Sequence, residues 1–326
     1  MRAAWYDKNG PASEVLLVGE LPTPQPGPGE VRVRLATSGV NPSDVKARSG
    51  RTRKIAYPRV IPHSDGAGVI DAVGDGVPAG RIGERVWTWN AQWKRAFGTC
   101  AEYVVLPADL AVPLPASVSV EAGACLGIPA MTAAHVVATA QAWAGSTLLI
   151  SGGAGAVSHY AIQLAKARGA VVITTVSSPA KAELARAAGA DHVIDYRKDD
   201  VGARVAELTD GGGVDAVIEL DIAVNAALLP KVLRPRGTVV IYGTGAAEAP
   251  MPLYFFLTNI ITLKFVFVYE LTAEERAAAL SMIAEAIAQD RLVHNIARVM
   301  PLAEVAAAHE AVESGQVVGN VVLRID

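Results

Sequence analysis

Two hydrophobic patterns divide the chain near residue 120. Before it, apolar residues come in short runs separated by glycine and proline turns. Val31–Leu35 alternates apolar and charged residues, as a half-buried strand does. Similar short runs follow at Gly66–Val73, Arg85–Trp89 and Tyr103–Leu106. Short strands between such turns predict a small β-barrel over residues 1–120.

After residue 120, apolar runs alternate with segments of helical periodicity. Helices are expected between the strands, for example at Val201–Leu208 and Asn225–Leu233. This alternation predicts an α/β domain with a parallel, doubly wound sheet over residues 121–270. We expect residues 271–326, which contain two more helices and the strand Gly319–Arg324, to return to the first domain. The expected strands of the sheet are Thr147–Ser151, Val171–Val176, His192–Asp195, Val214–Leu220 and Gly237–Tyr242.

The apolar stretch Met251–Tyr269 is interrupted by Pro252, Asn259 and Lys264, which favours a buried or edge strand over a membrane span. In Thr262–Tyr269 the larger side chains fall on one face at the strand period of two. As the sixth strand, this run would lie at the sheet edge, where an open apolar strand invites pairing with other chains. We therefore expect a homodimer formed by pairing of this strand with its own copy across a two-fold axis.

Composition narrows the class of protein. The chain has 326 residues and a net charge of -3, which gives no electrostatic reason to expect nucleic acid or an anionic membrane as a partner. Its two cysteines cannot build a disulfide framework or a four-thiolate zinc site. The first residues, Met1–Asp7, lack the apolar core of a signal peptide. We expect a cytoplasmic enzyme.

A glycine-rich turn follows the first strand of the α/β domain. Gly152, Gly153 and Gly155 come directly after Thr147–Ser151, and a helical pattern then runs to Gly169. Strand, glycine turn, helix and strand form the first βαβ unit of a dinucleotide-binding fold, in which the helix N-terminus receives the pyrophosphate. The pattern is incomplete, because Ser158 stands where a third glycine would pack the helix on the strand.

The end of the second strand indicates which dinucleotide binds. An NAD site usually has an acidic residue there, for the ribose 2′-hydroxyl. Here the strand ends in Thr174-Thr175-Val176-Ser177-Ser178, and Lys181 follows within one helical turn. A lysine and two hydroxyls favour a 2′-phosphate, and hence NADPH. The alternative is a surface lysine on a solvated helix.

Four motifs together resemble the medium-chain dehydrogenase/reductase superfamily: Gly39–Asp44, Pro62–Val69, Gly83–Val86 and the turn at 152–158. Within it, the chain is most similar to the zinc-independent NADPH:quinone oxidoreductases, the zeta-crystallin-like group. The resemblance runs the whole length of the chain. It implies a GroES-like barrel domain together with a Rossmann domain, NADPH as cofactor and a homodimer.

The same resemblance implies that no metal is bound. Zinc-using members of the superfamily have a cysteine where Asn41 stands and a His-Glu pair where Ser64-Asp65 stands. Asparagine and serine are poor zinc ligands. His63, next to a ligand position, is interpreted as a structural or substrate-pocket histidine.

The resemblance also implies which residues form the site. Asn41 and Lys46 would lie by the nicotinamide, with Lys46 standing where relatives commonly have tyrosine. Ser177 and Lys181 would bind the 2′-phosphate, and Tyr196 would lie near the adenosine. The pyrophosphate turn would comprise Gly152, Gly153, Ala154, Gly155, Ala156 and Val157. The remaining positions near the cofactor would be Thr132, Tyr242, Gly243, Thr244, Phe265, Phe267 and Asn320.

These features predict an NADPH-dependent reductase that transfers hydride to a quinone or a conjugated enone without a metal. Asn41 and Lys46 are the expected donors to the negative charge that grows on the substrate oxygen. Two alternatives stay open: a zinc-type alcohol dehydrogenase relative, and a non-catalytic NADPH-binding protein. The aromatic segment from Trp87 to Phe97 is either a loop packed on the barrel or a lid over a flat substrate.

Overall fold

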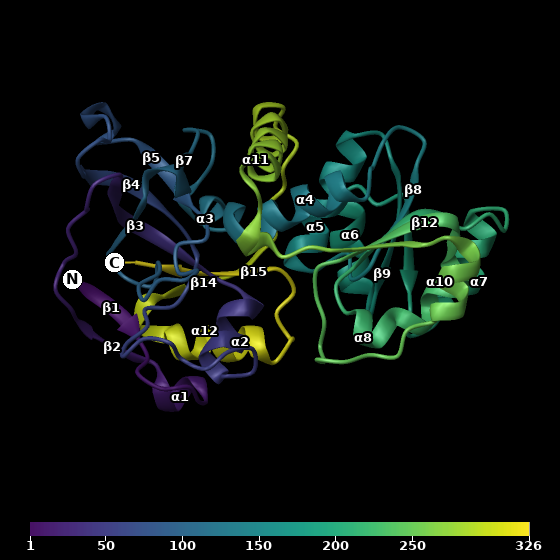
Figure 1. Cartoon of the computed structure of the whole chain (residues 1–326), viewed down its shortest axis with the longest axis horizontal. Helices are drawn as coiled ribbons and strands as arrows, with labels where there is room; N and C mark the ends of the chain where they lie inside the picture. Colours follow the sequence, from purple (N-terminus) through teal and green to yellow (C-terminus); the bar gives the residue numbers. More distant parts are fainter. Residues whose placement is uncertain (326) are drawn as a thin grey trace. The chain divides into compact units, whose positions relative to one another are not determined.

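The computed structural model describes residues 1–325, which form two compact units (Figure 1). The first comprises Met1–Pro129 and the chain from Ile296 onward, and the second comprises Ala130–Asn295. The chain returns to the first unit at residue 296, whereas the sequence prediction placed this return at residue 271. The difference is helix α11 (Ala273–Ala288), which packs on α4 (Met131–Thr139) and α5 (Ala156–Ala167) of the second unit.

The first unit is built on a seven-stranded sheet centred on the long strand β3 (Glu30–Val40). One edge of β3 pairs antiparallel with β4 along most of its length. The other edge is shared, because β6 pairs with its first half and β15 with its last residues. The predicted barrel strands are confirmed, and the sheet consists of β3, β4 (Asp65–Val73), β5 (Arg85–Thr88), β6 (Tyr103–Pro107), β7 (Ala111–Pro113), β14 (Ile296–Pro301) and β15 (Asn320–Arg324).

The core of this unit combines both ends of the chain. Val31 and Val33 of β3 are buried against Leu302, Val305 and Ala308 from the C-terminal segment. A separate antiparallel pair, β1 (Arg2–Trp5) with β2 (Leu17–Glu20), adds Ala3 and Ala4 to the same core. The helical elements are α1 (Ala12–Val15), α2 (Pro42–Ser49), η1 (Ala79–Arg81), η2 (Ala108–Leu110), α3 (Val120–Gly123), η6 (Leu302–Glu304) and α12 (Val305–Glu313).

The second unit contains a six-stranded parallel sheet with the order β10-β9-β8-β11-β12-β13. The chain starts in the middle at β8, moves outward to β10, and then crosses to β11 on the other side, as in a doubly wound fold. The predicted parallel sheet is thus confirmed. Its strands are β8 (Thr147–Ile150), β9 (Val171–Val176), β10 (His192–Asp195), β11 (Val214–Glu219), β12 (Leu233–Ile241) and β13 (Thr262–Phe265).

Helices cover both faces of this sheet, so its central strands are largely apolar. Leu149 of β8 lies in the cluster that α7, α9 and α10 complete, while its neighbours Leu148 and Ile150 are buried outside this cluster. Helices α4, α5 and α11 pack on one another. The remaining elements are η3 (Leu126–Ala130), α6 (Pro179–Ala187), α7 (Val201–Leu208), α8 (Ile222–Asn225), η4 (Ala226–Leu228), α9 (Leu229–Val232), α10 (Leu253–Asn259) and η5 (Val268–Glu270).

Three predicted elements differ from the structure. The apolar stretch at 251–269 was expected as a strand, but Leu253–Asn259 after Pro252 forms helix α10. The single helix expected at 225–233 is instead a series of short turns, because Pro230 in the first turn of α9 lacks the N–H that would continue a preceding helix. The strand expected over 262–269 ends at Phe265, because Val268–Glu270 forms a 3₁₀ turn. The position of β13 at the sheet edge is as predicted.

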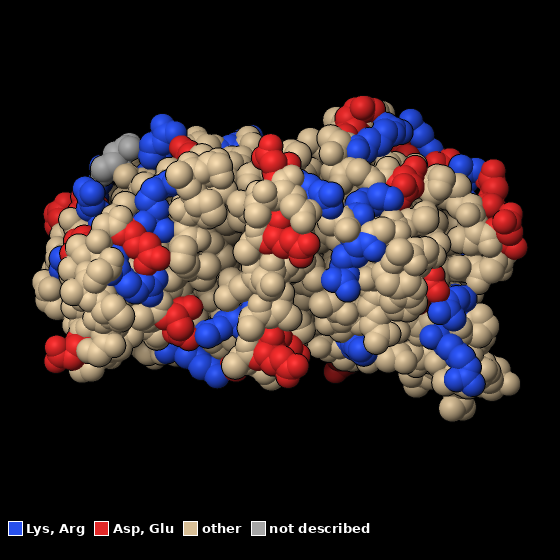
Figure 2. Space-filling model, turned by 90° about the horizontal axis from the view of Figure 1, so that it is seen from above, with Lys and Arg blue, Asp and Glu red and all other residues tan. Residues whose placement is uncertain are grey.

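The surface agrees with a small net charge. Figure 2 shows basic and acidic side chains interspersed over the face that it views, with wide uncharged areas between them. None of the helices within residues 1–325 is both long and apolar enough to cross a membrane.

Candidate functional site

The glycine turn between β8 and α5 has the backbone that a dinucleotide cradle needs. Gly152 has a φ of 68°, which favours glycine, and a Cβ there would lie 2.4 Å from the Leu220 side chain. A Cβ on Gly153 would lie 2.3 Å from the Thr174 hydroxyl. Gly155 is the N-cap of the twelve-residue helix α5 and offers no side chain to its first turn. The helix N-terminus is therefore open to an anion such as a pyrophosphate.

Ser158 occupies the place of the third glycine without disturbing the turn. Its side chain is buried, and its hydroxyl donates to the Ser151 carbonyl at 2.7 Å. The same hydroxyl lies 3.0 Å from the Tyr242 hydroxyl and accepts its hydrogen bond, because the one Ser158 hydroxyl hydrogen is donated to Ser151. Burial raises the pKa of Tyr242, which stays a neutral phenol. Ser158 thus joins α5 to β8 and to the end of β12 by hydrogen bonds where a glycine would allow only close packing.

The two residues expected at the 2′-phosphate come together where β9 meets α6, and Tyr196, expected near the adenosine, follows the neighbouring strand β10. The Lys181 ammonium donates to the Ser177 hydroxyl at 3.0 Å, so the two groups lie side by side. Ser178 is the N-cap of α6 and accepts from the Lys181 N–H. Tyr196 follows β10, and its N–H donates to the Val176 carbonyl. The acid that lies in register with Val176 is Asp195 of β10, which is 3.9 Å from the Lys198 ammonium.

A buried carboxylate beneath the glycine turn was not among the predicted site residues. Glu219, the last residue of β11, accepts from the Ser151 hydroxyl at 2.6 Å. Its other oxygen accepts from the Asp221 N–H and from Asn225 at 2.6 and 2.8 Å. Glu219 therefore holds the end of β8 and the start of α8 together just before the turn begins. The signal in the sequence was an acidic residue at the end of a largely apolar strand.

The other predicted residues of this unit occupy different places. Tyr242 and Gly243 follow β12, and a Cβ on Gly243 would lie 2.1 Å from the Leu220 carbonyl oxygen. Thr244 is exposed, and its hydroxyl donates to the Ala246 carbonyl. Phe265 ends β13, while Thr132 is buried in α4. Phe267 lies just beyond β13, with its ring 5.1 Å from that of Tyr269.

In the first unit, Asn41 is held between two buried carboxylates. Its side-chain amide donates to Asp65 at 2.7 Å, and its backbone N–H donates to Asp44 at 2.8 Å. The second oxygen of Asp65 accepts from the Ile128 N–H at 2.8 Å. A Cβ on Gly127 would lie 2.1 Å from this oxygen, so only glycine permits the approach. Burial raises the pKa of Asp44 to about 7 and that of Asp65 well above its usual value, against the hydrogen bonds from Asn41.

Asn320 lies beside Asn41, where the neighbouring strands β15 and β3 meet at their ends. Val321 of β15 is in register with Val40 of β3, so Asn320 and Asn41 are the next residues of the two antiparallel strands. Gly39 is likewise in register with Asp65. The structure thus brings Asn41, Asp65 and Asn320 together at the ends of β3, β4 and β15, although Asn320 was predicted only from the family pattern.

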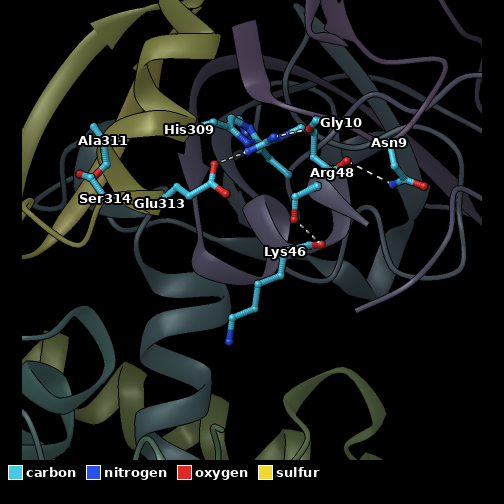
Figure 3. A network of polar contacts seen from close by, with 10 residues as sticks. Asn9, Gly10, Lys46, Arg48, His309, Ala311, Glu313 and Ser314 are labelled. Carbon is cyan, nitrogen blue, oxygen red and sulfur yellow. Dashed lines mark hydrogen bonds and ion pairs between the residues drawn. The ribbon is translucent and has the colours of Figure 1, made fainter. Parts of the chain in front are cut away.

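Lys46 and Arg48 both lie on helix α2, but their side chains extend into different regions. Figure 3 shows the Lys46 side chain pointing away from a polar network around Arg48. In this network the buried Arg48 donates to the Gly10 carbonyl and forms an ion pair with Glu313 at 2.8 Å. Asn9 donates to the Arg48 carbonyl at 3.1 Å. Arg48 therefore ties α2 to α12, and the half-buried Lys46 extends from the same helix toward a different region.

His63 is a structural histidine. Its Nε2 lies 2.9 Å from Nε2 of His309 on α12, and its Nδ1 lies 2.8 Å from the Ser38 hydroxyl. Burial lowers the pKa of His63 to about 3 and that of His309 well below its usual value, so both rings are neutral. The pair links the segment before β4 to the C-terminal helix.

A zinc site can be tested on the same residues. The positions of the expected ligands hold Asn41, Ser64 and Asp65, and Asp65 already accepts two hydrogen bonds. An amide and a hydroxyl beside one occupied carboxylate do not make the nitrogen and sulfur ligand set that zinc prefers. Across residues 1–325, no group of three His, Cys, Asp or Glu side chains is placed to hold a metal ion. A nicotinamide dinucleotide, in contrast, fits the open turn at 152–157.

An α/β unit with this glycine turn, combined with a unit built on an antiparallel sheet, defines a nicotinamide-dependent dehydrogenase or reductase fold. Family models agree with both units. Residues 27–116 match the alcohol dehydrogenase GroES-like domain, and residues 156–285 match the zinc-binding dehydrogenase domain.

Full-length relatives identify the family. The chain is 31% identical to a 2-haloacrylate reductase of Burkholderia sp over 99% of this chain and 98% of the relative. It is 32% identical to a quinone oxidoreductase of Pseudomonas aeruginosa over 95% of each chain. The chain therefore belongs to the medium-chain dehydrogenase/reductase superfamily, and it is an oxidoreductase similar to the quinone oxidoreductases.

Solved structures share the fold over the whole length. An NAD-dependent alcohol dehydrogenase superposes with a TM-score of 0.91 and 31% identity, covering 100% of both chains. The quinone oxidoreductase of Escherichia coli, in complex with NADPH, superposes with a TM-score of 0.87 and 27% identity, covering 99% of this chain and 100% of that one. The fold prediction of a Rossmann sheet together with a GroES-like domain is confirmed.

Proposed function

We propose that this protein uses NADPH to reduce a quinone or a conjugated enone, and that it does so without a metal ion. The observation that carries the proposal is the hydrogen-bonded pair of Asn41 and Asp65 at the positions where zinc-using relatives hold their metal. A ligand set of amide, hydroxyl and carboxylate favours reduction assisted by hydrogen bonds over reaction at a zinc ion.

The choice of NADPH is supported by the end of β9. Ser177 and Lys181 present a hydroxyl and an ammonium together, and no acid ends this strand. Asp195 on the neighbouring strand has Lys198 beside it. A 2′-phosphate would gain a charge-assisted hydrogen bond from Lys181, whereas a 2′-hydroxyl would gain only a neutral partner from Ser177.

The bound cofactor would supply a hydride from its nicotinamide. The protein would orient the two reactants and stabilise the charge that develops on the substrate oxygen. Asn41 is preorganised for this task, because Asp65 holds one amide N–H at 2.7 Å and thereby fixes the side chain. Lys46, from the same helix, would add a positive charge.

The names of the relatives also support a quinone or conjugated enone as substrate. Quinones and 2-haloacrylates are both electron-poor, conjugated acceptors of hydride. The second candidate is a zinc-type alcohol dehydrogenase, which the family model for residues 156–285 and the structural similarity to an alcohol dehydrogenase favour.

One set of assays separates the candidates. NADPH oxidation is followed with 1,4-benzoquinone and with a conjugated enone, and NADP⁺ reduction is followed with ethanol. Each assay is run before and after dialysis against a chelator, with elemental analysis of the purified protein. We expect quinone or enone turnover that survives chelation, and no stoichiometric zinc. One tightly held zinc per chain, with activity lost on its removal, would instead establish the alcohol dehydrogenase. Tight NADPH binding without turnover of any of these compounds would establish a non-catalytic NADPH-binding protein.

A further inference from the structure

The segment from residue 46 to residue 59 is strongly basic. It contains no Asp or Glu, although the whole chain has a net charge of -3. Within this segment Arg48 forms an ion pair with Glu313 at 2.8 Å, and Arg59 forms one with Asp7 at 3.1 Å. The cations of the segment are Lys46, Arg48, Arg51, Arg53, Lys54 and Arg59.

Arg53 is the cation of this segment that the loop at 90–97 holds in place. One terminal nitrogen donates to the Gln92 side chain at 2.7 Å, and the guanidinium lies 5.1 Å from the centre of the Trp93 ring. Gln92 is itself buried and donates to the Arg95 carbonyl at 2.8 Å. Stacking on an aromatic ring orients the planar fork of an arginine, which matches a carboxylate.

The guanidinium of Arg53 has donors to spare. Within residues 1–325, Gln92 accepts its one hydrogen bond to protein, and no carboxylate forms an ion pair with it. The side chain is nevertheless half-buried. An oriented cation with unused N–H groups is suited to binding an anion.

Arg53 also lies close to the Asn41 helix. Burial raises the pKa of Asp44, whose carboxylate accepts the Asn41 N–H, and the nearby charge of Arg53 opposes this rise. Lys46 is on the same helix, two residues beyond Asp44. A negative group bound at Arg53 would therefore be near the residues that the proposed function assigns to the reacting end of the substrate.

We propose that the substrate is an alkene conjugated to a carboxylate and that Arg53 binds this carboxylate. The inference rests on the proposed reductase function and specifies its substrate class. In the reaction, hydride from NADPH adds to the β carbon, the π electrons move toward the carboxylate, and a proton adds to the α carbon, while NADPH becomes NADP⁺. Because the intermediate carries a second negative charge, two cations, Arg53 and Lys46, suit it better than neutral donors.

The test compares an acid with its own ester. We expect wild-type enzyme to show a kcat/KM at least about tenfold higher for 2-chloroacrylate than for methyl 2-chloroacrylate, because only the acid can bind Arg53 by a charge-assisted pair. Arg53→Met should lower kcat/KM for the acid about ten- to a hundredfold, while the rates with the ester and with 1,4-benzoquinone change less than about threefold. The neutral compounds show whether the variant is folded. Arg51→Met, which removes an exposed cation of the same segment, should change each of the three rates less than about threefold.

Binding gives a readout apart from turnover. Calorimetric titration of the NADP⁺ complex with propanoate and with propanamide should show Arg53-dependent binding of the anion alone. Equal preference for acid and ester, with benzoquinone turnover intact, would overturn the carboxylate inference and leave the reductase in place. Absence of turnover with all three compounds, together with Arg53-dependent binding of propanoate, would overturn the proposed reductase and leave the anion site in place.

Discussion

Asp65 shows how one buried residue can determine the shape of a site. Both of its oxygens accept hydrogen bonds, one from the Asn41 amide and one from the Ile128 N–H. These two hydrogen bonds require an acceptor oxygen on each side of the group. A carboxylate has two such oxygens, whereas a carboxamide has only one. The side chain therefore joins β3, β4 and the segment at 126–130 through a single group.

Asp65→Asn should destabilise the protein. Its new NH₂ group would face either the Asn41 amide or the Ile128 N–H, donor against donor, and leave buried polar groups unpaired. We expect a loss of about 1–3 kcal/mol in the free energy of unfolding, measured by urea denaturation. Asp75→Asn, in an exposed turn, is the matched control and should be neutral. Equal stability of Asp65→Asn and the wild type would show that this network contributes nothing to the fold.

His159 predicts a pH dependence of stability. Its Nδ1 accepts from Gln163 at 3.0 Å, and burial, with His294 nearby, lowers its pKa to about 4 from 6.5. Between pH 4 and 6.5 the unfolded chain therefore binds the proton more strongly, and this part of the stability is lost as the pH falls through that window. Asp44 acts in the opposite direction, because its pKa is raised to about 7 and its contribution falls as the pH rises from 3.8 toward 7.

The His159 contribution can be isolated by difference. In His159→Gln, the change of unfolding free energy with pH between 6.5 and 4 should be shallower than in wild type by up to one proton, or about 1.4 kcal/mol per pH unit. The measurement is urea denaturation at several pH values, with His192→Gln, a half-buried histidine of β10, as control. Parallel pH profiles for His159→Gln and wild type would contradict the assignment.

At the scale of elements, the junction of β9 and α6 carries the cofactor preference. Ser178 caps α6, and this cap places Lys181 one turn later, where its ammonium meets Ser177. Lys181→Ala should weaken NADPH binding about ten- to a hundredfold and leave NADH binding almost unchanged, because only the 2′-phosphate loses a charge-assisted hydrogen bond. Titration of both cofactors against wild type, Lys181→Ala and the control Lys198→Ala measures this. An unchanged NADPH affinity in Lys181→Ala would show that Lys181 is a surface lysine.

Local pattern predicted the elements whose own residues decide their structure. The β8–α5–β9 unit could be predicted from the sequence, because turn glycines act within a few residues. The end of β13 could not be predicted from its own residues, because β13 ends where the pairing with its partner strand β12 ends, at Ile241. Nor was the place of α11, which depends on α4 and α5, more than a hundred residues earlier in the chain.

For the site residues too, local interactions could be predicted from the sequence and long-range interactions could not. The glycine turn and the Ser177–Lys181 pair could be predicted because neighbours in the sequence form them. Glu219, 68 residues from Ser151, and Asp65, 24 residues from Asn41, act only through long-range contacts. Their hydrogen bonds arise from strand register, which no local pattern specifies.

At the scale of the whole molecule, we propose a homodimer formed through the open edge of β13. Phe265 is 74% exposed at this edge, and helix α10 just before it leaves Leu257 77% exposed. The Val266 N–H donates to Ile241 of β12, so alternation along the strand turns the Phe265 N–H toward the open edge. The open backbone groups of this four-residue edge strand are satisfied when it pairs with its own copy.

This geometry selects the variant that tests the dimer. Phe265→Pro removes a donor on the open edge and keeps the ladder with β12, so it should yield a folded protein with a weaker dimer in sedimentation at micromolar concentration. Val266→Pro would instead break the internal ladder and report on folding. Ile82→Ser, at an exposed apolar residue of the first unit, is the control. A monomeric wild type, or a Phe265→Pro variant with an unchanged dimer, would refute the model.

The position of β15 in the sheet has a consequence for how the chain folds during translation. This strand lies between β3 and β14, and the preceding segment supplies Leu302, Val305 and Ala308 to the core that β3 lines. The unit that begins the chain therefore lacks part of its sheet and core until translation has reached Arg324, while residues 130–295 have every strand of their own sheet earlier. Vectorial synthesis, which usually lets the leading domain fold first, here favours the inserted one. The first unit cannot complete its sheet until β15 has been synthesised, and β3 stays incompletely paired until then.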